Sequence, residues 1–287
     1  MCDEMQLAEM GREGVSRRQF AALGAMSALA ACAPIDSVRA QGGLTESDVS
    51  FTAPGGTMDA FFVHPAQGAH PAVIIWPDIA GLRDAFKVMA RRLAGSGYSV
   101  LVVNPYYRDA PAPQFADFED FREQGGFQKV GPWREKNSAE GVMDTAKAVV
   151  AWLDGQDAVD ASRGIGNQGY CMGGPYTVWT AAAVPDRVKA AASFHGGGLV
   201  GDAPTAPINL LGQTQASFLI AIARNDDAQA PTEKDLLAQA ANAATRPAEI
   251  EVYDGDHGWT VPDSPVYAEA EAERAWARLL ETYSAAL

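Results

Sequence analysis

Short apolar runs alternate with amphipathic segments along most of this chain. Runs such as 72–76 are continuous, as expected of strands buried on both faces of a sheet. Between such runs apolar residues recur at helical spacing, as Phe86, Met89 and Leu93 do within 85–95. The expected strands are 49–53, 58–64, 72–76, 98–103, 164–170, 189–194, 217–223 and 248–253, and the expected helices are 85–95, 138–154, 173–183, 232–244 and 264–285.

This alternation predicts an α/β fold with a mostly parallel central sheet and helices on both faces. The pattern shows no internal repeat and no linker after residue 45, so residues 41–287 are expected to form a single domain. Residues 109–137 are expected to be a long loop region. Its aromatic side chains are expected to belong to the core rather than to a pocket wall. They are Phe115, Phe118, Phe121, Phe127 and Trp133.

Residues 1–40 are predicted to be an export signal. The adjacent Arg17 and Arg18 precede the apolar, small-residue run 21–33, and this order is typical of export signals. The paired arginines resemble the twin-arginine type, so the twin-arginine export machinery is an expected partner and the periplasm the expected location. Cleavage after Ala40 is favoured, and lipidation of Cys32, which would anchor the protein to a membrane, is the alternative.

The composition is acidic and typical of a globular protein. The 287 residues include 22 Lys+Arg and 36 Asp+Glu, a formal net charge of −14. This balance argues against a nucleic-acid partner, because phosphates are bound by basic side chains. The four histidines form no pair at the helical spacing of metal ligands. No metal is therefore expected, and the cysteine-dependent hydrolysis considered below needs no organic cofactor either.

The strongest chemical signal is Gly169-Tyr170-Cys171-Met172-Gly173, between an expected strand and an expected helix. It matches the nucleophile elbow, in which a tight turn lifts a serine or cysteine above the strand ends. The helix N-terminus would stabilise a thiolate, and the Met172 amide is placed to bind an oxyanion. Cys171 is therefore the candidate nucleophile. A buried structural cysteine in a glycine-rich turn is the alternative.

A cysteine nucleophile needs a base and an orienting carboxylate, which in this kind of fold follow in the order nucleophile, acid, histidine. His257 follows the last expected strand and is the favoured base. His195 is expected to be a polar residue near the rim of the site. The acid is expected in the loop 223–231, where Asp226 and Asp227 both qualify. Asp226 is favoured because it lies three residues past the strand end.

The chain resembles the dienelactone hydrolase family over roughly residues 48–285. Four motifs carry the resemblance, in the order of the family: WPDIAGL at 76–82, NPYYRDAP at 104–111, GYCMGG at 169–174 and DGDHGW at 254–259. The resemblance implies an α/β-hydrolase fold and a small-molecule ester or lactone as substrate. It also implies a catalytic triad of Cys171, Asp226 and His257.

The same resemblance implies further site residues. The amides of Ile79 and Met172 would form the oxyanion hole. Asp78 stands where the family usually has a glutamate that helps to activate the thiol. Because aspartate is one methylene shorter, that activation is expected to be weaker or differently aimed here.

Arg108 matches the family arginine that holds a substrate carboxylate. Its alternative role is a surface ion pair with Asp109. At Val261, four residues after His257, members of the family carry a second arginine. One carboxylate contact is therefore missing here, and hydrolysis of some ester or lactone is expected rather than of a dienelactone itself.

An exported, non-catalytic ligand-binding protein on the same scaffold is the second hypothesis, since a fold alone does not fix a function. The departures at Asp78 and Val261 leave room for it. The presence of Cys171, Asp226 and His257 in the order of the family favours the enzyme.

Overall fold

The structure is a computed structural model, and it describes residues 43–287. The predicted export signal, with Cys32 and Ala40, lies outside the described residues. Within 43–287, no helix is long and apolar enough to span a membrane. In the same range, no cluster of three or more His, Cys, Asp and Glu side chains is arranged to hold a metal ion.

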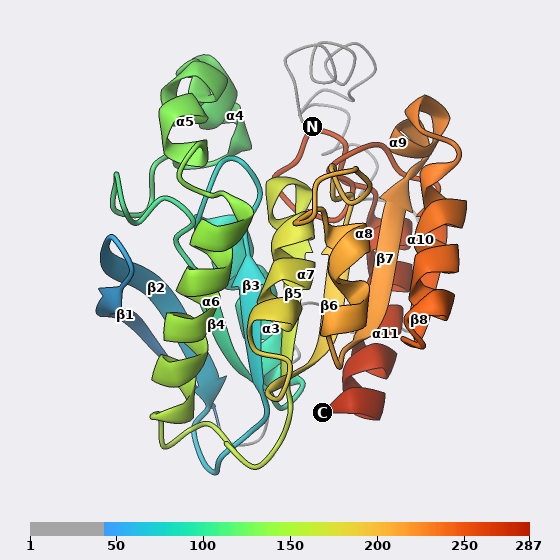
Figure 1. Ribbon diagram of the computed structural model, residues 1–287. Coiled ribbons are helices and arrows are strands. Elements are labelled where there is room, and N and C mark those ends of the chain that lie inside the picture. The colour runs from blue at the N-terminus through green and yellow to red at the C-terminus, as the bar shows by residue number, and fades with distance from the viewer. Residues whose placement is uncertain (1–42) are drawn as a thin grey trace, which may run out of the picture.

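The described residues form one eight-stranded sheet, in the order β1-β2-β4-β3-β5-β6-β7-β8 (Figure 1). The hairpin of β1 and β2 joins β4 in antiparallel fashion, and every other neighbouring pair is parallel. The predicted, mostly parallel sheet is thus confirmed. The strands are β1 (Leu44–Ala53), β2 (Gly56–Pro65), β3 (Ala72–Trp76), β4 (Ser99–Val103), β5 (Ile165–Tyr170), β6 (Val188–Phe194), β7 (Ser217–Ala223) and β8 (Ala248–Tyr253).

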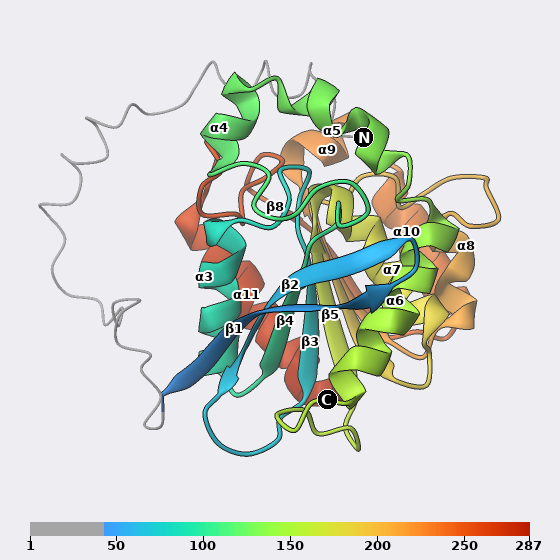
Figure 2. The same cartoon turned by 90° about the vertical axis from the view of Figure 1, so that its left-hand side faces the viewer.

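Helices cover both faces of the sheet (Figures 1 and 2). One face is covered by α3 (Asp84–Gly95) and α11 (Glu269–Ala286), and the other by α6 (Ala139–Asp154), α7 (Gly174–Ala183) and α10 (Glu233–Ala243). The shorter helical segments are α4 (Phe118–Glu123), α5 (Gly126–Arg134), η2 (Cys171–Gly173), α8 (Pro207–Leu210), η3 (Leu211–Gln213) and α9 (Arg224–Gln229).

The central strands separate two hydrophobic cores. Along β3, Ile74 and Trp76 belong to the core beneath α6 and α7, whereas Val73 and Ile75 belong to the core beneath α3 and α11. This alternation follows from the two-residue period of a strand. Because both faces are buried, the strand is an uninterrupted apolar run in the sequence.

Residues 109–137 are not a long loop, because α4 and α5 lie within them. Asp117 caps α4 by accepting a hydrogen bond from a backbone N–H of its first turn at 2.8 Å. Gly125, with φ of 63°, allows the sharp turn into α5. These helices have six and nine residues, too few to show a helical hydrophobic period in the sequence. They lie beyond the end of the sheet at which the parallel strands finish (Figure 1).

The aromatic side chains of this segment pack in the core, as expected. The ring centroid of Phe121 lies 5.0 Å from that of Phe115, 5.5 Å from that of Phe118 and 4.9 Å from that of Phe127. The Trp133 ring packs instead on Tyr106, at 5.5 Å. The aromatic cluster thus fixes α4 and α5 to the body of the protein.

Candidate active site

Cys171 stands at a tight strand-to-helix turn. It directly follows β5 and begins η2, which leads into α7. Its φ is 52°, in the left-handed region that L-residues rarely adopt and that often marks functional sites. Cys171 is 5% exposed.

Two glycines of this turn are required by close backbone approach. A Cβ at Gly169 would lie 2.0 Å from the carbonyl oxygen of Gly173, and one at Gly173 would lie 2.4 Å from that of Trp76. Neither contact is sterically possible. The pentapeptide therefore has the backbone geometry expected of a nucleophile elbow.

A cavity of about 650 Å³ opens beside Cys171. Ile79 and Met172 line it together with Cys171, so the structure brings the candidate nucleophile and both candidate oxyanion residues to one cavity. Its wall also contains three charged residues, which the sequence did not single out. They are Arg134, Glu135 and Glu233.

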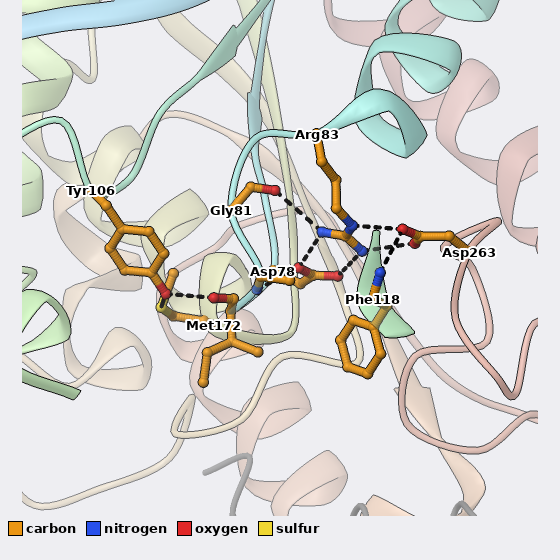
Figure 3. Close-up of polar contacts among 9 residues, drawn as sticks. Asp78, Gly81, Arg83, Tyr106, Phe118, Met172 and Asp263 are labelled. Atoms are coloured by element: carbon orange, nitrogen blue, oxygen red, sulfur yellow. Dashed lines mark hydrogen bonds and ion pairs between the residues drawn. The ribbon is translucent and has the colours of Figure 1, made fainter. Parts of the chain in front are cut away.

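The peptide between Ile79 and Ala80 is held at both of its polar atoms (Figure 3). The Ala80 N–H donates to Asp78 Oδ1 at 2.9 Å. The Tyr106 hydroxyl donates to the Ile79 carbonyl at 2.7 Å and lies 3.4 Å from Met172 Sδ. No backbone acceptor within residues 43–287 takes the Ile79 N–H, which therefore remains available to a substrate oxygen.

The Asp78 carboxylate is bound by Arg83. Arg83 Nη1 donates to Asp78 Oδ1 at 2.7 Å and Nη2 to Oδ2 at 2.9 Å. Both residues are buried. Burial by itself lowers the pKa of the Arg83 guanidinium, but the Asp78 and Asp263 carboxylates outweigh it and raise that pKa. A role of Asp78 in activating the thiol stays a prediction.

His257 and Asp226 form a hydrogen-bonded pair. His257 Nδ1 lies 2.7 Å from Asp226 Oδ2, and the backbone N–H of His257 donates to Asn225 Oδ1 at 2.8 Å. Asp227 instead binds Lys234, at 2.5 Å. The acidic segment, expected as a loop, is the short helix α9, and its geometry places Asp226 rather than Asp227 against the histidine.

His195 is buried behind His257, and the expectation of a rim position is wrong. His195 is 1% exposed, and its Nε2 lies 2.9 Å from Thr260 Oγ1. Its ring packs edge-to-face against His257 and against Trp259. Burial, with a smaller contribution from His257, holds the pKa of His195 well below its usual range.

The Arg108 guanidinium makes contacts within the scaffold. It donates to the carbonyls of Pro54 and Gly141, each at 3.0 Å, and to Thr145 Oγ1 at 2.7 Å. The alternative, an ion pair with Asp109, is not formed, because Asp109 binds a lysine instead. Arg108 is not among the described residues that line the cavity, and its role in substrate binding stays a prediction.

The arginine that lines the cavity is Arg134, the last residue of α5. Within residues 43–287 its guanidinium has no carboxylate partner. The sequence did not single it out, because residues 109–137 were expected to be a loop region, where an arginine is usually exposed to solvent. Its position between β4 and α6, at the end of the sheet where the site lies, is the signal that could have found it.

Comparisons with known proteins identify the family of the chain. The profile of the dienelactone hydrolase family matches residues 58–287. A Salmonella typhi protein named "Putative carboxymethylenebutenolidase" is 30% identical over 251 residues, which cover 85% of this chain and 88% of that protein. An Escherichia coli K12 protein of the same name is 30% identical over 241 residues, which cover 82% and 84%.

Solved structures show the same fold. A Klebsiella pneumoniae structure described as a "Putative Dienelactone Hydrolase" superposes with a TM-score of 0.70 and 25% identity, covering 84% of this chain and 99% of that chain. The expected α/β-hydrolase fold is thereby confirmed. With the family profile matching most of its length, the chain belongs to the dienelactone hydrolase family.

Proposed function

We propose that the protein hydrolyses a small ester or lactone through a thioester on Cys171, with His257 as the base and Asp226 as its orienting acid. The hydrogen bond between His257 Nδ1 and Asp226 Oδ2 carries the proposal. It favours the tautomer with a proton on Nδ1, which leaves Nε2 as an acceptor. An imidazole held in this way is suited to take a proton from a thiol.

Acylation forms the thioester. The Cys171 proton passes to Nε2 of His257, and the sulfur forms a bond to the substrate carbonyl carbon. The carbonyl oxygen becomes an oxyanion, which the Ile79 and Met172 amides stabilise. When the tetrahedral adduct collapses, its bond to the alcohol oxygen breaks, and that oxygen takes the proton from the imidazolium. In a lactone the alcohol stays attached to the acyl group.

Deacylation consumes one water molecule. His257 takes a proton from the water, whose oxygen attacks the thioester carbon. Collapse of this second adduct breaks the carbon–sulfur bond, releases the carboxylic acid and returns the proton to Cys171. These steps balance without an oxidant, a reductant or a cofactor.

The cavity supports a substrate of moderate size. Its volume of about 650 Å³ lies within the range of roughly 300–1,000 Å³ that is common for small-molecule sites. Its wall carries both basic and acidic groups, and burial raises the pKa of Glu233. A small ester or lactone with at least one polar substituent fits this lining.

Turnover of small aryl esters and lactones tests the proposal. We expect kcat/KM to fall on the order of 10³-fold or more in Cys171→Ala and in His257→Ala. The matched control His70→Ala, at a partly exposed histidine whose ring hydrogen-bonds to the nearby Gln67 carbonyl, should keep its turnover. Mass spectrometry should find one acyl group on Cys171.

Two outcomes would contradict the proposal. Unchanged turnover in Cys171→Ala would exclude the thioester. Ligand affinity without turnover or labelling of Cys171 would instead indicate the non-catalytic binding protein.

We also propose that the protein is exported to the periplasm by the twin-arginine machinery. The support is the order of Arg17, Arg18 and the apolar run 21–33. Cleavage after Ala40 would release the domain, whereas lipidation of Cys32 would anchor it.

A further inference from the structure

Arg83 is a buried cation that uses all of its donors. It directly precedes α3 and is 1% exposed. Its Nε and Nη2 donate to the two oxygens of Asp263 at 2.6 and 2.8 Å, and its Nη1 and Nη2 donate to those of Asp78 (Figure 3). Nη1 also donates to the Gly81 carbonyl at 3.2 Å. The five N–H groups of a guanidinium are thus all satisfied.

Through Arg83 and Asp263, three segments that are distant in the sequence are joined. Asp78 lies in the loop after β3, which carries Ile79. Asp263 lies in the loop between β8 and α11, which carries His257. Asp263 Oδ2 also accepts the N–H of Phe118, the first residue of α4, at 3.1 Å.

The charges make this junction resistant to rearrangement. One guanidinium faces two carboxylates, and the side chains of Arg83 and Asp78 are 0% and 5% exposed. Breaking a buried pair by removing one partner leaves an uncompensated charge, which is strongly unfavourable. A lysine would keep the charge, but it lacks the planar fork that bonds two carboxylates at once.

Asp78 connects Arg83 to the candidate oxyanion hole by hydrogen bonds. Asp78 Oδ1 bonds both the guanidinium and the Ala80 N–H. Because the Tyr106 hydroxyl holds the Ile79 carbonyl of the same peptide, that peptide cannot rotate while Asp78 stays in place. The Ile79 N–H belongs to the preceding peptide, between Asp78 and Ile79, so a shift of Asp78 would move this N–H directly.

We propose that Arg83 is a positioning residue of the hydrolytic site. It holds the Ile79 amide in the orientation that an oxyanion needs, and it keeps the His257 loop fixed relative to that amide. Arg83 does not contact the substrate, since it is not among the described residues that line the cavity. The inference rests on the proposed function.

Arg83→Met tests the proposal, because methionine has a similar reach but neither the charge nor the fork. We expect kcat to fall about 10- to 100-fold, the range that a small misplacement of a catalytic group produces. KM should change by less than about threefold, because the lost interaction acts on the transition state. Arg83→Lys should also lower kcat. The matched control is Arg92→Met, in the helix α3 that follows Arg83, where the arginine pairs with Glu273 at the surface; its kcat should be unchanged.

Circular dichroism and melting curves show whether each variant is folded. A folded Arg83→Met enzyme with wild-type kcat overturns the proposal, and so does a rise in KM with kcat unchanged. If Arg83→Met does not fold, Arg83→Lys and Asp263→Asn test the proposal instead. Asp263→Asn is expected to fold, since Asp263 is partly exposed and asparagine has the same shape as aspartate. Wild-type kcat in both of these variants overturns the proposal.

Cys171→Ala in the same assay separates this inference from the proposed function. If Cys171→Ala keeps its turnover, the proposed function fails. If Cys171→Ala is inactive while the Arg83 variants keep wild-type kcat, only the positioning role of Arg83 fails.

Discussion

The imidazole of His195 packs against that of His257, with ring centroids 5.0 Å apart and ring planes at 61°. Protonation of His195 would bury a charge and place it beside the candidate base. Both effects hold the pKa of His195 well below its usual range. His195 is therefore a neutral support for His257 in the folded protein.

This pair predicts a specific pH dependence of stability. As pH falls through about 6.5, the ordinary pKa of histidine, the unfolded chain binds a proton at His195 that the folded chain does not. The free energy of unfolding is therefore expected to fall as pH drops below this value. His195→Asn does not titrate and tolerates the φ of 41°.

Melting temperatures measured at about pH 7.5 and about pH 5.5, on either side of the ordinary histidine pKa, check this prediction. The difference between the melting temperatures at the two pH values should be smaller in His195→Asn than in the wild-type protein. His70→Asn, at a less buried histidine, serves as the control. Equal differences in all three proteins would contradict the assignment of the effect to His195.

Asp226→Asn is expected to lower kcat on the order of 10³- to 10⁴-fold, because the imidazole loses the carboxylate that fixes its tautomer. The matched variant Asp227→Asn loses only the ion pair with Lys234 and should keep its kcat. Steady-state kinetics on one aryl ester compares the two. A larger fall in kcat in Asp227→Asn than in Asp226→Asn would show that Asp227 is the orienting acid.

Arg134→Gln is expected to raise KM about tenfold for esters that carry a carboxylate, because the substrate loses one charge-assisted hydrogen bond. Neutral esters should be hardly affected. Arg108→Gln tests the role that the family resemblance implies for Arg108. If the selective rise in KM occurs there and not in Arg134→Gln, Arg108 binds the carboxylate.

Gly173→Ala is expected to destabilise the fold by about 1–3 kcal/mol, the cost of forcing an atom into closely packed surroundings. Its Cβ would meet the Trp76 backbone, which cannot move without shifting β3. Gly212→Ala, where a Cβ has no neighbour within 4 Å, is the control. Urea denaturation midpoints measure both, and equal midpoints would refute the steric argument.

Replacing Arg17 and Arg18 together by lysine is expected to keep the protein in the cytoplasm, because the paired arginines address the export machinery. Fractionation against a cytoplasmic marker measures this. Cys32→Ser separates the two processing routes. It should release the protein from membranes only if Cys32 is lipidated.

The sequence predicted the strands most reliably where burial is two-sided. Residues 72–76 and 217–223 are strands with the expected bounds, because an apolar run between turn residues leaves few alternatives. The edge strand 248–253 also has the expected bounds, although its residues are only partly buried. The helices α4 and α5 were not predicted, because six and nine residues are too few to show a helical hydrophobic period. Capping by Asp117 was the local signal for α4.

The sequence could predict which residues belong to the candidate site, but it could not predict how they contact one another. The motifs placed Cys171, Asp226 and His257 at loops that the fold brings to one end of the sheet. The buried position of His195 and the junction at Arg83 depend on contacts between distant segments. Asp263, which lies 180 positions from Arg83, has no local feature that would reveal this pairing.

The residues proposed to contact the substrate outside the reacting group lie in a different part of the fold from the residues proposed to react. The elbow and the support of the Ile79 amide belong to the sheet and its adjoining turns, where steric limits allow little variation. Arg134 and Glu135 belong to a surface excursion between β4 and α6. We expect substitutions at Arg134 and Glu135 to change the range of accepted substrates with little effect on the fold, because neither residue belongs to the sheet or to the buried aromatic cluster.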